Sequence, residues 1–201
     1  MERLGILGGT FDPPHDGHLA LARAARRALR LAGVWWVLTP DPPHKDRSDL
    51  SPYGVRREML LAAIAGEPVY SLCEVENERP GPQFMVDTIA ILRERYPRSD
   101  FYLLVGEDSL RDLPLWHRPL DLIAECPLAV LGRPGVPADL DALEMRVPGV
   151  RARTTLLNAA EVDISSTAIR ERVARGEPIR GLLPAAVEEI IRNRGLYRRE
   201  G

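Results

Sequence analysis

Short runs of apolar, often β-branched residues alternate along the chain with longer amphipathic segments. Such runs are typical of buried strands. Six are present, at residues 3–9, 33–40, 69–75, 100–106, 127–132 and 153–158. Between the first two runs, four apolar residues repeat at helical spacing, namely Leu19, Ala22, Ala25 and Leu29, while arginines occupy another stripe. The same periodicity predicts helices over residues 52–64 and 84–96.

This alternation predicts an α/β fold, Rossmann-like and doubly wound, with helices on both faces of a mostly parallel sheet of about six strands. In such folds, ligands bind at the carboxyl ends of the strands. We therefore expect function near four strand ends: Gly8, Pro40, Gly106 and Leu131. After residue 158 the pattern becomes helical, and the last predicted helix begins at Pro184 and ends at Gly195. The C-terminal segment is therefore expected to be helical.

Length and composition indicate a single domain over residues 1–201. Hydrophobic residues make up 45% of the chain, which suffices for a sizeable core. The formal net charge is only -2, so no general basic field attracts nucleic acid or a membrane surface. Cys73 and Cys126 lie far apart and in no zinc or redox pattern. We expect a soluble, cytoplasmic protein whose two cysteines are core thiols.

The segment GGTFDPPHDGH, residues 8–18, joins the first predicted strand to the first helix. Gly8 and Gly9 end the strand, and without β-carbons their backbone N–H groups can approach a ligand closely. Phosphate is a common ligand of such turns. The spacing matches neither the G-x-G-x-x-G pattern nor the P-loop pattern, so a different phosphate chemistry is indicated.

Two histidines three residues apart stand at the start of the predicted helix. Pro13 and Pro14 stiffen the loop and Gly17 lets it turn, so His15 and His18 can converge near the positive helix end. Imidazoles placed there can donate hydrogen bonds to an anion. A helix cap and a metal pair are the alternative interpretations, although no cysteine or acidic pattern supports the metal.

Lys45 is the only lysine in a chain with 27 lysine and arginine residues. A general drift toward arginine explains the total, but not why this one position has an ammonium group. Lysine is a compact, mobile point charge and arginine a rigid fork, so a site fitted to one is not served by the other. Lys45 is therefore a candidate for a specific role, and a solvated surface lysine is the alternative.

The segment 8–18 resembles the T-x-x-P-x-H-x-G-H signature of the nucleotidylyltransferase superfamily, and ISSTAIR at Ile164–Arg170 resembles its second signature. Within the superfamily, the chain resembles bacterial nicotinate-nucleotide adenylyltransferases along nearly its whole length, through PPHK, RREML, DTIAIL, GEDSL, WHR, RPG and GLLPAAVEEIIRNRGLY. The resemblance implies an enzyme of NAD biosynthesis. Its reaction would transfer the adenylyl group of ATP to nicotinate mononucleotide, giving deamido-NAD and pyrophosphate.

The resemblance also implies roles for particular residues. The catalytic group would be His15, His18, Lys45 and Arg170. ATP would contact Gly8, Gly9, Thr10, Gly106, Asp108, Ser166 and Thr167. The mononucleotide would contact Trp116, Met85, Thr88 and Arg133. Because the acceptor phosphate is already a nucleophile at neutral pH, the protein has to supply alignment and positive charge rather than a general base.

Some of these residues also have structural interpretations. Ser166 and Thr167 open a predicted helix, where hydroxyl and N–H groups favour phosphate, but they could simply cap it. Trp116 suits a pyridinium ring because indole is the best aromatic partner of a cation, although tryptophans are usually core residues. His117 and Arg118 are weaker candidates for the same region.

One departure from the family pattern precedes Asp87 and Thr88. Where the family commonly has Ser-Tyr-Thr, this chain has Gln83, Phe84 and Met85. Hydroxyl groups are missing here, so any polar contact with the mononucleotide in this segment would come from the backbone.

No protein residue is assigned as a metal ligand, since no acidic cluster suggests a cage. Mg²⁺ prefers water and substrate phosphates to many protein ligands, so it is expected to enter with ATP. Expected partners are ATP and nicotinate mononucleotide, with no nucleic acid and no membrane; a homo-oligomer is left open.

The alternative functions are an adenylyltransferase for nicotinamide mononucleotide or another small acceptor, and a catalytically silent nucleotide-binding module. A silent module would be expected to lack one of the four catalytic candidates, and all four are present.

Overall fold

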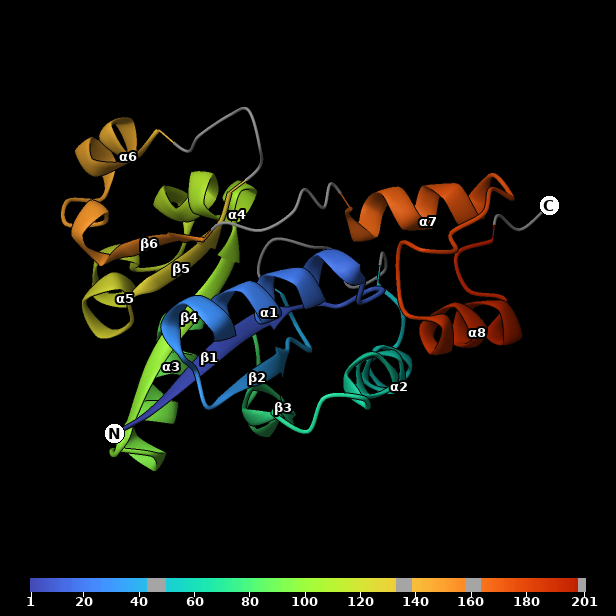
Figure 1. The fold of residues 1–201 in the computed structure, drawn as a ribbon, viewed down its shortest axis with the longest axis horizontal. Coiled ribbons are helices and arrows are strands. Elements are labelled where there is room, and N and C mark those ends of the chain that lie inside the picture. Colours follow the sequence, from blue (N-terminus) through green and yellow to red (C-terminus); the bar gives the residue numbers. More distant parts are fainter. Residues whose placement is uncertain (43–49, 133–138, 158–163, 199–201) are drawn as a thin grey trace.

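The computed structural model describes residues 1–42, 50–132, 139–157 and 164–198 of the chain. Its strands form one parallel sheet in the order β3-β2-β1-β4-β5-β6. Their bounds are β1 Glu2–Gly9, β2 Gly33–Leu38, β3 Tyr70–Cys73, β4 Ser99–Gly106, β5 Leu128–Leu131 and β6 Thr154–Leu157. The chain builds outward from β1 to β3 and then crosses to β4 on the other side of β1 (Figure 1). The predicted doubly wound α/β fold is confirmed.

Helices follow the strands as the periodicity predicts. The described α-helices are α1 Asp16–Leu29, α2 Tyr53–Ile64, α3 Met85–Arg95, α4 Glu107–Asp112, α5 Pro119–Glu125, α6 Leu140–Arg146, α7 Ser166–Ala174 and α8 Ala185–Arg194. Short 3-10 helices lie at η2 Val75–Glu78, η3 Leu113–Leu115 and η4 Arg151–Arg153. The predicted helices over 52–64 and 84–96 correspond to α2 and α3 within one residue at each end. None of the helices in the described ranges is long and apolar enough to cross a membrane.

The sheet separates two apolar cores because successive strand side chains point to opposite faces. Ile6 and Leu103 belong to the core beneath α3, α4, α5 and α6. Their neighbours Leu7 and Leu104 belong to the core beneath α1 and α2. Both faces of the central strands are therefore covered, which explains their nearly continuous apolar sequences.

The C-terminal helices build a third, smaller core. Apolar residues of α7, α8 and their connecting segment pack against Met59 of α2, with Ile169, Ile179, Leu183, Val187 and Ile191 buried among them. Figure 1 shows α8, in dark red, beside α2, and α7, in orange, at the same end of the molecule. The helical C-terminus is thus confirmed, and it lies close to the turn that follows β1.

Candidate active site

The turn after β1 brings two imidazoles into contact. His15 precedes the first residue of α1 and is only 7% exposed. Its ring stacks on that of His18 with 3.7 Å between the ring centroids. The backbone N–H of His15 donates a hydrogen bond to Nδ1 of His18 at 3.2 Å. The two histidines therefore converge at the N-terminus of a helix, as their spacing predicts.

The surroundings of these rings determine their protonation. Burial lowers the pKa of His15 to about 4, so its imidazole is neutral at neutral pH. Because Nδ1 of His18 accepts a hydrogen bond, the proton of its neutral form resides on Nε2. A β-carbon on Gly17 would lie 2.9 Å from Nδ1 of His15, which explains why glycine stands between the two histidines. The buried His15 ring is thus suited to donate a hydrogen bond rather than to act as a cation.

Residues of the second signature contact the same turn. The Ser166 hydroxyl donates to the carbonyl oxygen of Pro13 at 2.8 Å, and Nη1 of Arg170 donates to that of Asp12 at 2.8 Å. These contacts join positions more than 150 residues apart. The Arg170 guanidinium is therefore held on the loop that leads directly to His15.

At the start of α7, the residue that caps the helix differs from the residues that contact the turn after β1. The cap is Ser165, whose hydroxyl oxygen accepts a hydrogen bond from the N–H of Ala168 at 3.1 Å. Ser166 and Thr167 are therefore not needed as caps. Thr167 is exposed, and its hydroxyl oxygen accepts a hydrogen bond from Arg170 at 3.4 Å.

The other predicted ATP residues lie at the ends of two adjacent strands. Gly8 and Gly9 end β1, Thr10 follows them, and Gly106 ends the neighbouring β4. A β-carbon on Gly106 would meet no atom of the described residues within 4 Å, so these residues leave space there. Asp108 lies exposed in the first turn of α4. Strands β1 and β4 flank the point where the strand order reverses, which is where doubly wound sheets bind nucleotides.

An open cavity of about 290 Å³ adjoins this turn. Its walls come from the ends of β1 and β2, from η2, from the start of α3 and from the loop after η3. Met85 and Trp116, both predicted to contact the mononucleotide, line it together with Gly8, Gly9 and Thr10. The cavity therefore joins residues predicted for ATP to residues predicted for the acceptor.

Thr88, unlike Met85 and Trp116, is not part of the described lining. Thr88 is fully buried, and its hydroxyl lies 2.6 Å from Oε1 of Glu76, which does line the cavity. Thr88 therefore lies behind Glu76 and not on the surface of the cavity. Lys45 and Arg133 fall outside the described residues.

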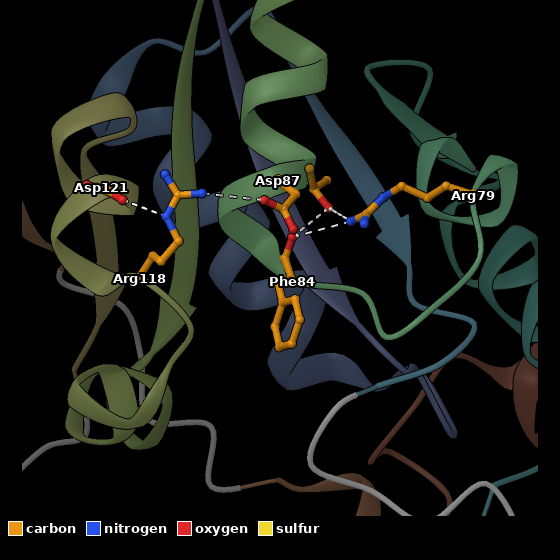
Figure 2. Close-up of polar contacts among 6 residues, drawn as sticks. Arg79, Phe84, Asp87, Arg118 and Asp121 are labelled. Atoms are coloured by element: carbon orange, nitrogen blue, oxygen red, sulfur yellow. Dashed lines mark hydrogen bonds and ion pairs between the residues drawn. The ribbon is translucent and has the colours of Figure 1, made fainter.

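Two arginines flank the start of α3 (Figure 2). Arg79 donates to the Phe84 carbonyl at 3.4 Å and to the Thr88 hydroxyl at 3.3 Å. On the other side, Arg118 lies 3.9 Å from Asp87 and donates to Asp121 at 2.6 Å. These contacts hold the segment that departs from the family pattern between η2 and α5.

The segment itself forms part of the cavity wall. Gln83 is buried, and its side-chain amide donates to the Arg79 carbonyl at 3.1 Å. The ring of Phe84 lies 4.3 Å, centroid to centroid, from that of His117. Residues at positions 83–85 are thus fixed by packing and by backbone contacts.

Arg56 is an important residue that the sequence reasoning missed. It is 2% exposed and donates to the carbonyl oxygens of Thr10 at 2.9 Å, Thr39 at 2.8 Å and Ser51 at 3.0 Å. One guanidinium thereby joins the ends of β1 and β2 to the start of α2. A signal was available, because Arg56 lies on the buried stripe of α2 with Met59, Leu60 and Ile64.

The fold and these residues define a class of enzyme, the nucleotidyltransferases. The family model described as Cytidylyltransferase-like matches residues 6–172, and the chain belongs to that family.

Curated relatives allow a finer assignment. The chain is 44% identical over 201 residues to a probable nicotinate-nucleotide adenylyltransferase of Thermomicrobium roseum, covering 98% of this chain and 92% of that protein. It is 44% identical over 198 residues to one of Gloeobacter violaceus, covering 98% and 96%. Within the family, the chain therefore belongs to the nicotinate-nucleotide adenylyltransferases, as the sequence motifs indicate.

Solved structures confirm the fold. The chain resembles Plasmodium falciparum nicotinic acid mononucleotide adenylyltransferase complexed with NaAD, with a TM-score of 0.80, 19% sequence identity and 98% of each chain covered. The same parasite enzyme complexed with APC gives a TM-score of 0.78 at 18% identity, again over 98% of each chain.

Proposed function

We propose that this chain transfers the adenylyl group of ATP to nicotinate mononucleotide. An oxygen of the mononucleotide 5′-phosphate attacks the α-phosphorus of ATP, the bond from that phosphorus to the bridging oxygen of the β-phosphate breaks, and pyrophosphate leaves. The products are deamido-NAD and pyrophosphate. The observation that carries the proposal is that Arg170 contacts the turn that leads to the stacked imidazoles, and that the same turn adjoins a cavity lined by Trp116.

The ATP side of the reaction needs donors aimed at developing negative charge. His15, whose buried imidazole is neutral, and His18 offer N–H donors at the positive end of α1, and Arg170 of α7 adds a cation held against the same loop. Gly8 and Gly9 allow the triphosphate to approach the backbone closely. We assign Thr10, Ser166 and Thr167 to the triphosphate on the same basis. Asp108 would instead accept hydrogen bonds from the ribose hydroxyls of ATP, and Gly106 would leave room for the nucleoside. Lys45 stays a proposed mobile cation.

We assign the cavity to the acceptor, nicotinate mononucleotide. Trp116 is half-buried and lines it, so its indole can stack on the pyridinium ring of the mononucleotide. Met85 lines the cavity at the start of α3, and Thr88 donates a hydrogen bond to Glu76, which also lines it. Arg133 stays proposed as an acceptor contact. Hydroxyl side chains are absent at positions 83–85, so the backbone there would form the polar contacts with the carboxylate substituent of the pyridine ring.

We propose Mg²⁺ as the divalent ion that accompanies ATP. Within the described ranges, no group of three or more His, Cys, Asp or Glu side chains is arranged to hold a metal ion. The chemistry of the described site therefore fits an ion carried mainly by substrate phosphates and water. When bound, the ion would neutralise phosphate charge; the residues of this chain align the reactants.

We propose a single domain over residues 1–201 and a cytoplasmic location. Helix α2 supports the first, because it contributes both to the sheet core and to the C-terminal core. The free thiols of Cys73 and Cys126 support the second, since they suit a reducing compartment. Formation of a homo-oligomer stays an open expectation.

A pyrophosphate-release assay with ATP and Mg²⁺ tests the reaction. The purified chain should release pyrophosphate with nicotinate mononucleotide and markedly less with nicotinamide mononucleotide. His18→Ala should lower kcat about 100-fold, because it removes one preorganised donor. Arg27→Ala, an exposed position on the same helix, is the control and should leave kcat unchanged. No pyrophosphate with either acceptor would indicate a silent module, and equal rates with both would refute the acid preference.

A further inference from the structure

The C-terminal segment returns to the loop that carries the two histidines. After α8 ends at Gly195, the hydroxyl of Tyr197 donates a hydrogen bond to Oδ1 of Asp12 at 2.5 Å. The Tyr197 side chain also packs against the small C-terminal core of α2, α7 and α8. A residue near one end of the chain is thereby fixed to the turn that follows its first strand.

Asp12 is the point at which several elements meet. It is fully buried, and its Oδ2 accepts a hydrogen bond from the backbone N–H of Ser51 at 3.0 Å. Its carbonyl oxygen accepts the bond from Arg170. A buried carboxylate has to be hydrogen-bonded, since the loss of its hydration otherwise destabilises the folded state. Tyr197 therefore supplies one of the contacts that keep this side chain, and the backbone attached to it, in place.

The Tyr197 hydroxyl is suited to be a permanent donor. Burial, followed by the negative charge of Asp12, raises the pKa of Tyr197 well above its ordinary value. The hydroxyl therefore keeps its proton at neutral pH and can donate to Asp12.

Only two prolines separate Asp12 from His15. Because proline fixes its own backbone torsion φ, the connection through Pro13 and Pro14 is stiff. A displacement of Asp12 therefore displaces His15 as well. His15 in turn stacks on His18 and donates to its Nδ1. A shift of Asp12 thus reaches both imidazoles.

We propose that Tyr197 is a positioning residue for adenylyl transfer, acting through Asp12 to set the orientation of His15 and His18. Tyr197 is not among the residues that line the cavity. The inference rests on the proposed function, because it needs the histidines to act on the phosphates. Small errors of alignment lower the rate of the chemical step more than they lower binding.

Tyr197→Phe tests this role, with Tyr53→Phe as the matched control. Tyr53 also donates its hydroxyl to a carboxylate, that of Glu74, at 3.1 Å. Each variant keeps its ring and loses one such bond. Tyr197→Phe should lower kcat about tenfold while leaving the KM values for ATP and mononucleotide within about twofold. Tyr53→Phe should leave all three constants unchanged.

A second readout separates positioning from general loss of stability. The imidazole resonances of His15 and His18 in nuclear magnetic resonance spectra should move in Tyr197→Phe and stay in place in Tyr53→Phe. An unchanged kcat, unchanged imidazole resonances or an equal loss of kcat in both variants would overturn the inference. If the wild-type chain releases no pyrophosphate, the proposed function fails as well. If the wild type and His18→Ala behave as expected but Tyr197→Phe equals the wild type, only the inference about Tyr197 fails.

Discussion

The imidazole of His15 stacks on that of His18, with 29° between the ring planes, and only His15 is deeply buried. Two protonated imidazoles in such contact would repel each other, and burial disfavours a charge on His15 in any case. Burial therefore favours a neutral His15 ring at neutral pH. This ring can present an N–H donor to a polyanion without a buried charge having to be neutralised first.

This burial makes folding stability depend on pH. The pKa of His15 is lowered from 6.5 to about 4 in the folded state, so between these values the unfolded chain binds more protons. Stability is therefore full above about pH 6.5 and falls as the pH drops toward 4. Between pH 7 and pH 5 the loss from His15 should be about 2 kcal/mol. Urea unfolding of the wild type and of His15→Gln at several pH values measures it.

The difference between the two proteins is the informative quantity. Other groups titrate in both, so their contributions cancel. The free energy of unfolding should fall more steeply below pH 6.5 in the wild type than in His15→Gln. Parallel curves would show that His15 titrates normally and is not held neutral by burial.

Gly8 has no room for a side chain, because a β-carbon there would collide with the terminal methyl group of Met85. Met85 is flexible, so we expect Gly8→Ala to push it into the cavity rather than to unfold the protein. The KM for the mononucleotide should rise about tenfold, with little change in melting temperature. The double variant Gly8→Ala/Met85→Ala should resemble Met85→Ala alone, because the colliding methyl is gone. Additive effects on KM would contradict this explanation.

Arg56 and Arg57 are adjacent in α2 and offer a comparison of buried and exposed arginines. Arg56→Met would leave the carbonyl oxygens of Thr10, Thr39 and Ser51 without their donor. We expect it to lower the free energy of unfolding by about 3 kcal/mol or more. Arg57→Met removes only an ion pair with Glu74 at the surface and should change stability little. Denaturant unfolding of both variants measures the contrast, and equal losses would refute the structural role of Arg56.

The fold was predictable because its signal is local and repeated. Strand and helix periodicities alternate along the chain, and side chains such as Ile6 and Leu7 face different cores without interrupting an apolar run. Pro184 and Gly195 similarly delimit α8 by their own backbone preferences. The two signatures were predictable for another reason, since residue type and spacing identify the family directly.

The contacts between distant segments were not predictable in the same way. Nothing in the sequence near Tyr197 indicates that its hydroxyl meets Asp12, because that contact depends on how the C-terminal core packs on α2. The exclusion of Thr88 from the cavity lining also has a packing cause. Its hydroxyl points to the buried Glu76, although a hydroxyl one turn into a helix could equally have faced a ligand.

Trp116 and Trp35 are both half-buried, yet only Trp116 lines the cavity beside the histidines. Because stacking on a cationic ring is strongest for indole, Trp116→Leu should raise the KM for nicotinate mononucleotide about tenfold and leave the KM for ATP unchanged. The KM of Trp116→Phe for nicotinate mononucleotide should lie between those of the wild type and Trp116→Leu, since a phenyl ring stacks more weakly than indole. Trp35 packs instead against Tyr96 and Phe101, so Trp35→Phe is the control and should alter neither KM. Steady-state kinetics with each substrate varied in turn distinguishes these cases. A parallel rise of both KM values in Trp116→Leu would mean that the indole supports the whole site, rather than binding the pyridinium ring.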